Sequence, residues 1–336
     1  MKRSIRIISL TLCMILLLLS VSACGASLYT RGKGELKIVA TVFFPFDIAR
    51  AVTGDNAEIT LLQSNGADLH DYSPSTSALS ALNDADIFIC IGGVSDKWTE
   101  DAITASENPE MRVIRLTELC EGRLTELEGH SHSEWCEEHH GHDHEHEHEH
   151  EHQHSADDGH GHTADEHIWL SPKNAVLATE AISSACADAD PDRSAEYLKN
   201  ASEYIASLLQ LDAEYRAVAD ASEKRTLVCA DRFPFIYLTN EYGICHFAAF
   251  SGCSSETDAS FATAVRLIEA VEHNGLGYIF VTESTDGRLA ESIASATGCE
   301  ILTLNSLQSV TAGDIDSGAT YLSIMKENLE TLKRAI

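Results

Sequence analysis

Short apolar runs alternate along the chain with segments whose apolar residues repeat at helical spacing, a pattern typical of parallel β-α units. In the first half we expect strands at 36–42, 57–62, 87–91 and 111–116, with helices at 45–52, 73–83 and 96–106. In the second half we expect strands at 226–229, 245–249, 278–281 and 300–304, with helices at 233–242, 260–273, 287–297 and 314–334. The pattern predicts an α/β fold of two lobes with mostly parallel sheets.

Two further helices are expected between the lobes, at 171–187 and 190–221. Ser73-Pro74 and Ser171-Pro172 each combine a helix-capping serine with a proline suited to the first turn, so each should start a helix. The helix at 190–221 carries a single apolar stripe. At about 1.5 Å per residue, roughly 30 residues make a rod of about 45 Å, long enough to run along both lobes. We therefore predict a long connecting helix.

The amino-terminal segment has the features of an export signal. Basic residues at positions 2, 3 and 6 precede an apolar stretch at 7–19, which is too short for a permanent membrane anchor. Val21-Ser22-Ala23-Cys24 then resembles a bacterial lipobox, in which the cysteine becomes the lipidated first residue. The alternative is an ordinary signal peptide with Cys24 as a bystander. We expect a protein anchored by lipid at the cell surface or on the periplasmic side of the cytoplasmic membrane.

A histidine-rich segment interrupts the first lobe. Residues 130–162 hold 13 of the 17 histidines, and imidazole alternates with carboxylate over 142–152. So polar a segment buries little apolar surface, and imidazole is the commonest protein ligand for zinc, so we predict a metal-collecting loop at 126–164. A solvated acidic linker and a pH sensor are the alternatives. The candidate histidines of this loop are His139, His140, His142, His144, His146, His148, His150, His152 and His154.

The overall charge narrows the range of partners. The formal net charge is −30, and outside residues 124–168 there remain 39 acidic residues against 23 basic ones. So acidic a chain is not expected to bind nucleic acid, whereas cations are natural ligands. The ten cysteines include no CxxC pair, so no zinc finger is indicated and disulfide pairing cannot be assigned. Cys90 lies in an apolar run and should behave as a small buried hydrophobe.

Two histidines outside the loop are candidate metal ligands. His70 lies between an expected strand and helix, and His167 lies just before the Ser171-Pro172 helix start. Loops at strand ends are where α/β lobes place their ligands. Taken alone, each histidine would more often be a surface or capping residue. Because both occur in the same context in a chain that also carries a metal-collecting loop, we predict that both bind metal.

These motifs together resemble one family. They are His70-Asp71-Tyr72-x-Pro74, Asp84-Ala85-Asp86, Gly92-Gly93 with Trp98, and Glu166-His167-Ile168-Trp169-Leu170-Ser171-Pro172, with further similarity at 193–211 and 323–329. The combination is similar to the zinc- and manganese-uptake solute-binding proteins of ABC transporters. The resemblance implies two α/β lobes joined by a long helix, with one metal ion between them. It also implies that His70 and His167 are the two ligands from the first lobe.

The second lobe departs from the pattern of that family. Zinc-binding members usually have His-Asp at the end of the first strand of this lobe, where this chain has Ala230-Asp231. Asp231 could be a third ligand or only a helix cap. Manganese-binding members add an acidic ligand in the last strand–helix loop, but residues 304–308 contain no acid or histidine. Glu256 is a possible fourth ligand and Glu283 another candidate, although such a residue is more often a capping or surface carboxylate.

We therefore expect a monomeric, lipid-anchored solute-binding protein that captures Zn²⁺ between two lobes and delivers it to an ABC permease, and not an enzyme. Mn²⁺ or Fe²⁺ as ligand, or an adhesin of the same fold, are alternatives. A secreted zinc hydrolase has less support because the chain lacks a Gly-x-Ser-x-Gly motif and a second metal–carboxylate cluster. The expected domains are the signal peptide 1–23, the tether 24–34, the first lobe 35–171, the connecting helices 172–222 and the second lobe 223–336.

Overall fold

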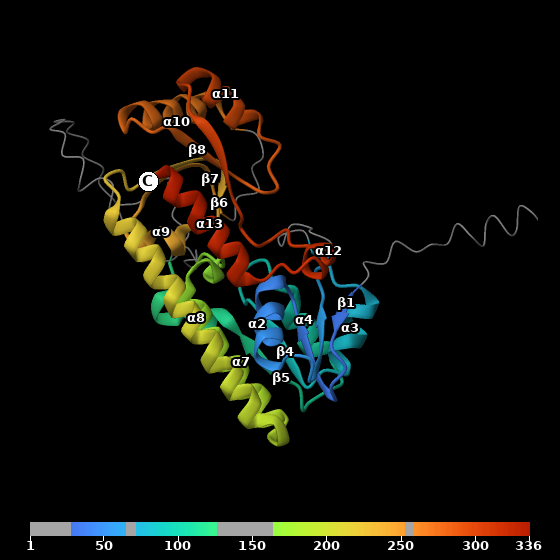
Figure 1. Ribbon diagram of the computed structural model, residues 1–336. Helices are drawn as coiled ribbons and strands as arrows, with labels where there is room; N and C mark the ends of the chain where they lie inside the picture. Colours follow the sequence, from blue (N-terminus) through green and yellow to red (C-terminus); the bar gives the residue numbers. More distant parts are fainter. Residues whose placement is uncertain (1–27, 65–71, 126–163, 253–258) are drawn as a thin grey trace, which may run out of the picture.

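The computed structural model describes residues 28–64, 72–125, 164–252 and 259–336, which form two α/β lobes against a pair of long helices (Figure 1). The amino-terminal lobe has a five-stranded sheet in the order β1-β3-β2-β4-β5. Its strands are β1 (Tyr29–Arg31), β2 (Leu36–Ala40), β3 (Ala57–Leu61), β4 (Ile87–Cys90) and β5 (Arg112–Arg115). All neighbouring pairs are parallel except β1 and β3, which are antiparallel.

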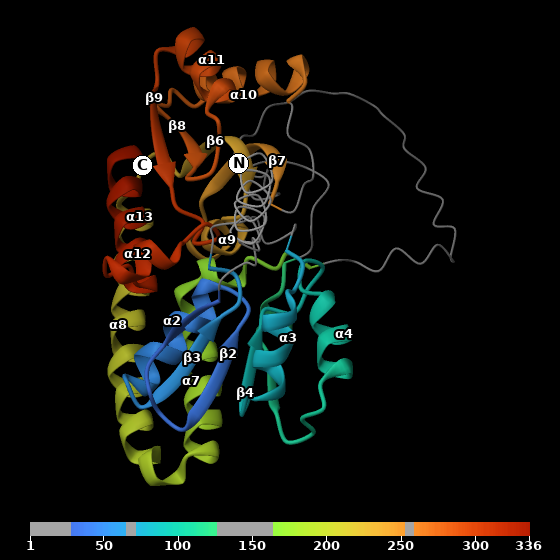
Figure 2. The same ribbon diagram turned by 90° about the vertical axis from the view of Figure 1, so that its right-hand side faces the viewer.

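Helices cover both faces of this sheet (Figure 2). They are α2 (Phe43–Thr53), α3 (Thr76–Asn83), α4 (Trp98–Ala105), the short α5 (Leu116–Leu119) and the 3-10 turn η2 (Glu121–Arg123). All four residues of β4 are fully buried, as expected of a parallel strand with helices on both faces. Cys90 is among them, which confirms that it behaves as a buried hydrophobe.

The carboxy-terminal lobe has a four-stranded, wholly parallel sheet in the order β7-β6-β8-β9. Its strands are β6 (Thr226–Phe233), β7 (Cys245–Ser251), β8 (Tyr278–Thr282) and β9 (Glu300–Leu304). Its helices are α9 (Ile236–Tyr242), α10 (Phe261–His273), α11 (Arg288–Thr297), α12 (Ala312–Asp316) and α13 (Tyr321–Ala335). Helices α10 and α11 pack on one face of the sheet, where they enclose a separate apolar cluster.

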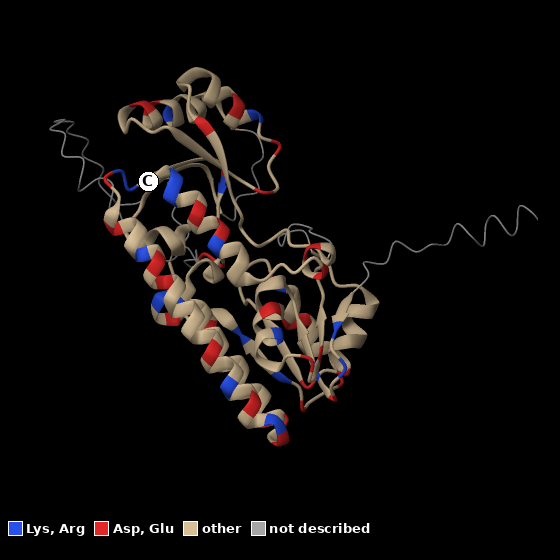
Figure 3. Cartoon of the chain, in the orientation of Figure 1, with Lys and Arg blue, Asp and Glu red and all other residues tan. Residues whose placement is uncertain are grey.

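Two long helices connect the lobes. Helix α7 (Pro172–Ala189) is capped by Ser171, whose hydroxyl accepts from the backbone N–H of Asn174, and the turn η4 (Pro191–Arg193) leads into α8 (Ser194–Ala221). Helix α8 has 28 residues, about 42 Å of length. Its buried face joins a cluster of apolar side chains that runs through both lobes. Most of the charged residues of α8 are acidic, and its two basic residues are Lys199 and Arg216 (Figure 3). The predicted fold of two lobes and a long connecting helix is confirmed.

Several local predictions differ from the structure. Strand β6 continues to Phe233, so the helix predicted from residue 233 begins only at Ile236. Residues 29–31, expected in the tether, form β1 at the edge of the sheet. Helix α3 is capped by Ser75, whose hydroxyl accepts from Ala78 N at 3.2 Å, so the predicted start at Ser73-Pro74 is wrong. The single helix predicted at 314–334 is two helices, because Gly318 adopts a φ of 100° and Thr320 caps a new helix. Within the described residues no helix combines the length and apolarity needed to span a membrane.

Candidate metal site between the lobes

His167 lies at the start of the 3-10 turn η3 (Ile168–Leu170), just before α7, and its side chain is fully buried. Its Nδ1 is 2.8 Å from Oδ1 of Asp165, and its backbone N–H donates to the same oxygen at 2.8 Å. A carboxylate at this distance favours the tautomer with the proton on Nδ1, which leaves a lone pair on Nε2. A neutral imidazole held in this way has the form that binds a divalent metal ion.

The carboxy-terminal lobe encloses the imidazole of His167. Its Nε2 is 2.7 Å from the side-chain nitrogen of Gln308, in the loop after β9. Gly252, just after β7, leaves little room for a side chain: an added Cβ would be 3.0 Å from Cε1 of His167 and 3.1 Å from Oδ2 of Asp165. His167 comes from the first lobe and is surrounded by strand-end loops of the second. It therefore lies where the two lobes meet.

The loop that carries Gln308 is fixed by its own hydrogen bonds. Glu283 accepts from the backbone N–H and the hydroxyl of Ser306, both at 2.8 Å. Leu307 is buried with a φ of 62°, an uncommon conformation for a branched residue, and its N–H donates to Asn305 Oδ1 at 2.8 Å. Glu283, considered above as a candidate ligand, thus fastens the loop that presents Gln308 to His167.

Asp231 lies near the carboxyl end of β6. Its Oδ1 accepts from Arg232 N at 2.8 Å, and its Oδ2 accepts from the backbone N–H of Thr282 at 3.3 Å and from the Thr282 hydroxyl. Helix α9 begins only at Ile236, so Asp231 is not its cap. Its carboxylate connects the ends of β6 and β8. Its role as a metal ligand stays a prediction.

Two more buried carboxylates stabilise the loop after β4. Glu166 accepts from the backbone N–H of Ser95 at 3.1 Å and from the Ser95 hydroxyl. A Cβ on Gly93 would be 2.4 Å from Oε2 of Glu166, which explains the glycine at this position. Burial raises the pKa of Asp96 to about 6; hydrogen bonds from the N–H groups of Ile91 and Gly92 oppose this shift, and Glu166 adds to it.

The remaining candidates lie outside the described residues: His70, Glu256, Cys24 and the histidines of the metal-collecting loop. Among the residues that the structure describes, no group of three or more His, Cys, Asp or Glu side chains could hold a metal ion. The structure brings His167 together with Asp165 and Gln308, neither of which was predicted from the sequence. The Asp-x-His spacing could have indicated Asp165 as a partner of His167. Gln308 is 141 positions from His167 in the sequence, and no neighbouring residues mark it as a contact.

Comparison with known proteins identifies the family. The profile described as zinc-uptake complex component A, periplasmic (ZnuA) matches residues 38–335. The zinc-binding lipoprotein AdcA of Streptococcus pneumoniae is 29% identical over 304 residues, which cover 90% of this chain and 56% of AdcA, so the chain spans little more than half of that relative. The high-affinity zinc uptake system protein ZnuA of Bacillus subtilis is 30% identical over 323 residues, covering 95% of this chain and 94% of the relative.

Solved structures agree with this assignment. The zinc-bound ZnuA-like domain of Streptococcus pneumoniae AdcA superposes with a TM-score of 0.68 at 28% identity, covering 90% of this chain and 98% of that domain. The metal-dependent lipoprotein YcdH of Bacillus subtilis has a TM-score of 0.71 at 24% identity over 90% of this chain and 99% of that one, which supports the fold alone. Because the family profile matches nearly the whole chain from Ile38 onwards, this protein belongs to the ZnuA family of periplasmic zinc-uptake components.

Proposed function

We propose that this protein is an extracytoplasmic solute-binding protein that captures Zn²⁺ between its lobes and delivers it to an ABC permease. The observation that carries the proposal is the environment of His167. Its imidazole is buried at the meeting point of the lobes, its Nδ1 faces the carboxylate of Asp165, and its Nε2 faces the opposite lobe. A histidine oriented by a carboxylate is the usual arrangement for a zinc ligand. The family of the chain and the names of its relatives support the same conclusion.

In this proposal His70 and His167 supply two neutral nitrogen donors from the first lobe. Asp231 and Glu256 are the candidate oxygen donors from the second lobe, which would complete a roughly tetrahedral site. The amide of Gln308 must turn or withdraw when the metal takes the Nε2 lone pair of His167. Mn²⁺ is the second candidate, because each carboxylate added to the site shifts its preference from zinc towards manganese.

Capture and release both depend on the meeting of the lobes. The ligands of one lobe bind the ion only while the other lobe is docked against them, so separating the lobes weakens the site. The shared core along α8 limits such motion to a small tilt, so we propose that contact with the permease, or protonation of the imidazoles, releases the ion. The histidine-rich loop would hold ions weakly close to the site and raise their local concentration.

The remaining features of the proposal concern location and assembly. Cleavage before Cys24 and lipidation of that cysteine would hold a monomer at the outer face of the cytoplasmic membrane. The domain boundaries are those given above, except that residues 29–31 pair with β3 and so belong to the first lobe. No catalytic role is proposed, because the ion is the cargo and no reaction is needed for capture.

Zinc titration in competition with a chelating dye tests this function. The wild-type protein should bind one ion tightly, and His167→Ala and His70→Ala should each lose that tight binding. His273→Ala is the matched control, because His273 is exposed at the end of α10. Undiminished tight binding in the double histidine variant would overturn the site. Competition between Zn²⁺ and Mn²⁺ at the wild-type site identifies the metal.

A further inference from the structure

The two ends of the segment that contains the histidine-rich loop meet at one point. The backbone N–H of Asp165 donates to the carbonyl oxygen of Thr125 at 2.8 Å, so the chain leaves and rejoins the first lobe at a single hydrogen bond. Asp165 is also the residue whose carboxylate orients His167. The point where the loop joins the lobe and the candidate ligand are therefore two residues apart.

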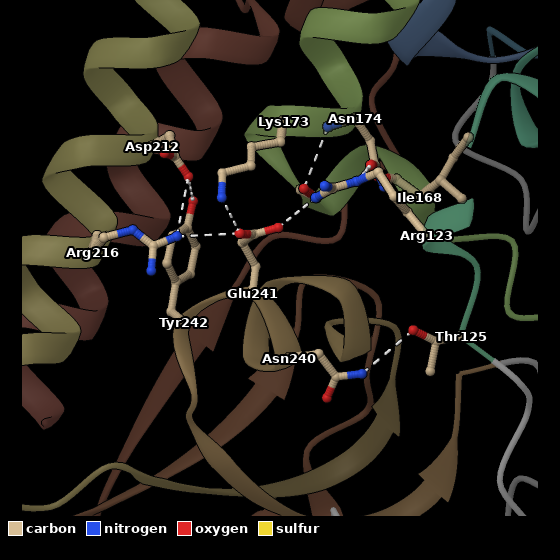
Figure 4. A network of polar contacts seen from close by, with 11 residues as sticks. Arg123, Thr125, Ile168, Lys173, Asn174, Asp212, Arg216, Asn240, Glu241 and Tyr242 are labelled. Atoms are coloured by element: carbon tan, nitrogen blue, oxygen red, sulfur yellow. Dashed lines mark hydrogen bonds and ion pairs between the residues drawn. The ribbon is translucent and has the colours of Figure 1, made fainter. Parts of the chain in front are cut away.

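A tyrosine of the opposite lobe contacts both ends of this segment. The hydroxyl of Tyr237, in the first turn of α9, donates to the carbonyl oxygen of Asp165 at 2.5 Å and accepts from the backbone N–H of Thr125 at 3.3 Å. Asn240, one turn further along α9, donates to the Thr125 hydroxyl at 3.4 Å (Figure 4). We call Thr125, Asp165 and Tyr237 the loop clasp. The clasp joins the two lobes beside His167.

Ion pairs fix helix α9 in the position that presents Tyr237. Glu241 accepts from Arg123 of the first lobe, from Lys173 of α7 and from Arg216 of α8 (Figure 4). The carboxylate of Glu241 is largely buried and is contacted by these three cations. The ion pairs hold α9 against the first lobe and both connecting helices. The hydroxyl of Tyr237 is thus placed by the packing of its helix and not by the segment that it contacts.

We propose that Tyr237 is a positioning residue for the metal site and acts through Asp165. Its hydroxyl fixes the backbone of Asp165, the Asp165 carboxylate fixes the imidazole of His167, and the Nε2 of His167 is thereby aimed across the junction of the lobes. Binding of the ion is in this way coupled to docking of α9 on the first lobe. The inference rests on the proposed function, because it requires His167 to bind the ion.

A pocket beside Tyr237 should allow a substitution there to change the position of Asp165 without changing the stability of the protein. This pocket of about 270 Å³ is lined by the clasp residues Thr125 and Tyr237, together with Asn240 and Glu241. It has room for water, which can satisfy the backbone groups of Thr125 and Asp165 when the phenol hydroxyl is removed. Tyr237→Phe should therefore fold normally while the fixed position of Asp165 is lost.

The test compares Tyr237→Phe with Tyr242→Phe. Tyr242 lies on the same helix and is also buried, but its hydroxyl donates to Asp212 of α8 at 3.0 Å (Figure 4). Losing a direct partner of a metal-binding histidine costs about 10–100-fold in affinity, so we expect a smaller loss, about 3–10-fold, for Tyr237→Phe. We expect faster zinc dissociation as well, and no change of either quantity in Tyr242→Phe. The visible absorption of the Co²⁺-loaded protein should change only in Tyr237→Phe, because it reports ligand geometry.

Further measurements separate the possible outcomes. The thermal midpoint of zinc-free Tyr237→Phe should match that of the wild type, while the rise in midpoint caused by zinc should be smaller. Tyr237→Phe should cause the same loss of zinc affinity in a protein that lacks residues 129–162, because the clasp lies outside that range. Wild-type affinity and Co²⁺ absorption in Tyr237→Phe, or an equal loss in Tyr242→Phe, would overturn the inference. Absence of tight zinc binding in the wild type would instead overturn the proposed function.

Discussion

Removing the charge of Asp165 should weaken zinc binding by a calculable amount. The carboxylate is buried and accepts from both the Nδ1 and the backbone N–H of His167 at 2.8 Å. Asp165→Asn keeps the shape and one acceptor oxygen but loses the charge, and a charge-assisted hydrogen bond is about twice as strong as a neutral one. We expect a loss of about 1.4 kcal/mol, or about tenfold in the zinc dissociation constant. Asp165→Ala also loses the acceptor and should cost about 100-fold.

The assay is competition between each variant and a fluorescent zinc chelator at fixed pH and ionic strength. Asp47→Asn is the control for loss of a buried carboxylate, since Asp47 pairs with Arg50 and with the backbone N–H of Tyr321. It should lower the thermal midpoint and leave zinc affinity unchanged.

Comparing Asp165→Asn with Asp165→Ala separates the role of the charge from the role of the acceptor oxygen. Wild-type affinity in both Asp165→Asn and Asp165→Ala would refute the view that this carboxylate orients the ligand. A loss in Asp165→Ala alone would show that a neutral acceptor is sufficient, and the assigned role of the charge would be wrong.

Three other predictions follow from the structure. Gln308→Glu replaces an amide 2.7 Å from the Nε2 of His167 with a carboxylate, and should tighten zinc binding in the same titration by about tenfold; weaker binding would contradict this. Burial raises the pKa of Asp96 from 3.8 to about 6, so the folded protein holds this proton more tightly than the unfolded chain does. The free energy of unfolding therefore falls as the pH rises through that range. Asp96→Asn should therefore flatten the pH dependence of the unfolding free energy between pH 4 and 6 by up to about 3 kcal/mol, and an unaltered slope in denaturant titrations would count against it. Deleting residues 129–162 should remove only weakly bound zinc in equilibrium dialysis, and loss of the tight ion would disprove a collecting role for the loop.

Much of the fold could be predicted from the sequence because its signals are local. The apolar run at 300–304 coincides with β9, and the serine–proline pair at 171–172 starts α7. Strand β1 could not be predicted in this way, because Tyr29–Arg31 has no apolar pattern and becomes a strand only by pairing with the edge of β3. The break before α13 depends on one glycine with a positive φ inside an otherwise helical pattern.

The candidate site was less accessible to sequence reasoning. His167 could be predicted from its loop context, because its signal lies in adjacent residues. Its contacts with Gln308 and Gly252 join segments that meet only when the second lobe docks on the first. The clasp through Tyr237 was not predictable for the same reason, since α9 reaches Asp165 across 72 positions of the chain.

The hydrogen bond between Asp165 and Thr125 has a consequence for how this protein can change over evolution. A segment that departs and returns at one point can gain or lose residues without stretching the lobe beneath it. Doubling the length of such a segment costs only about 0.6 kcal/mol in closure entropy. Under the proposed function, the number of collecting histidines can therefore change while the residues that would hold the central ion stay the same.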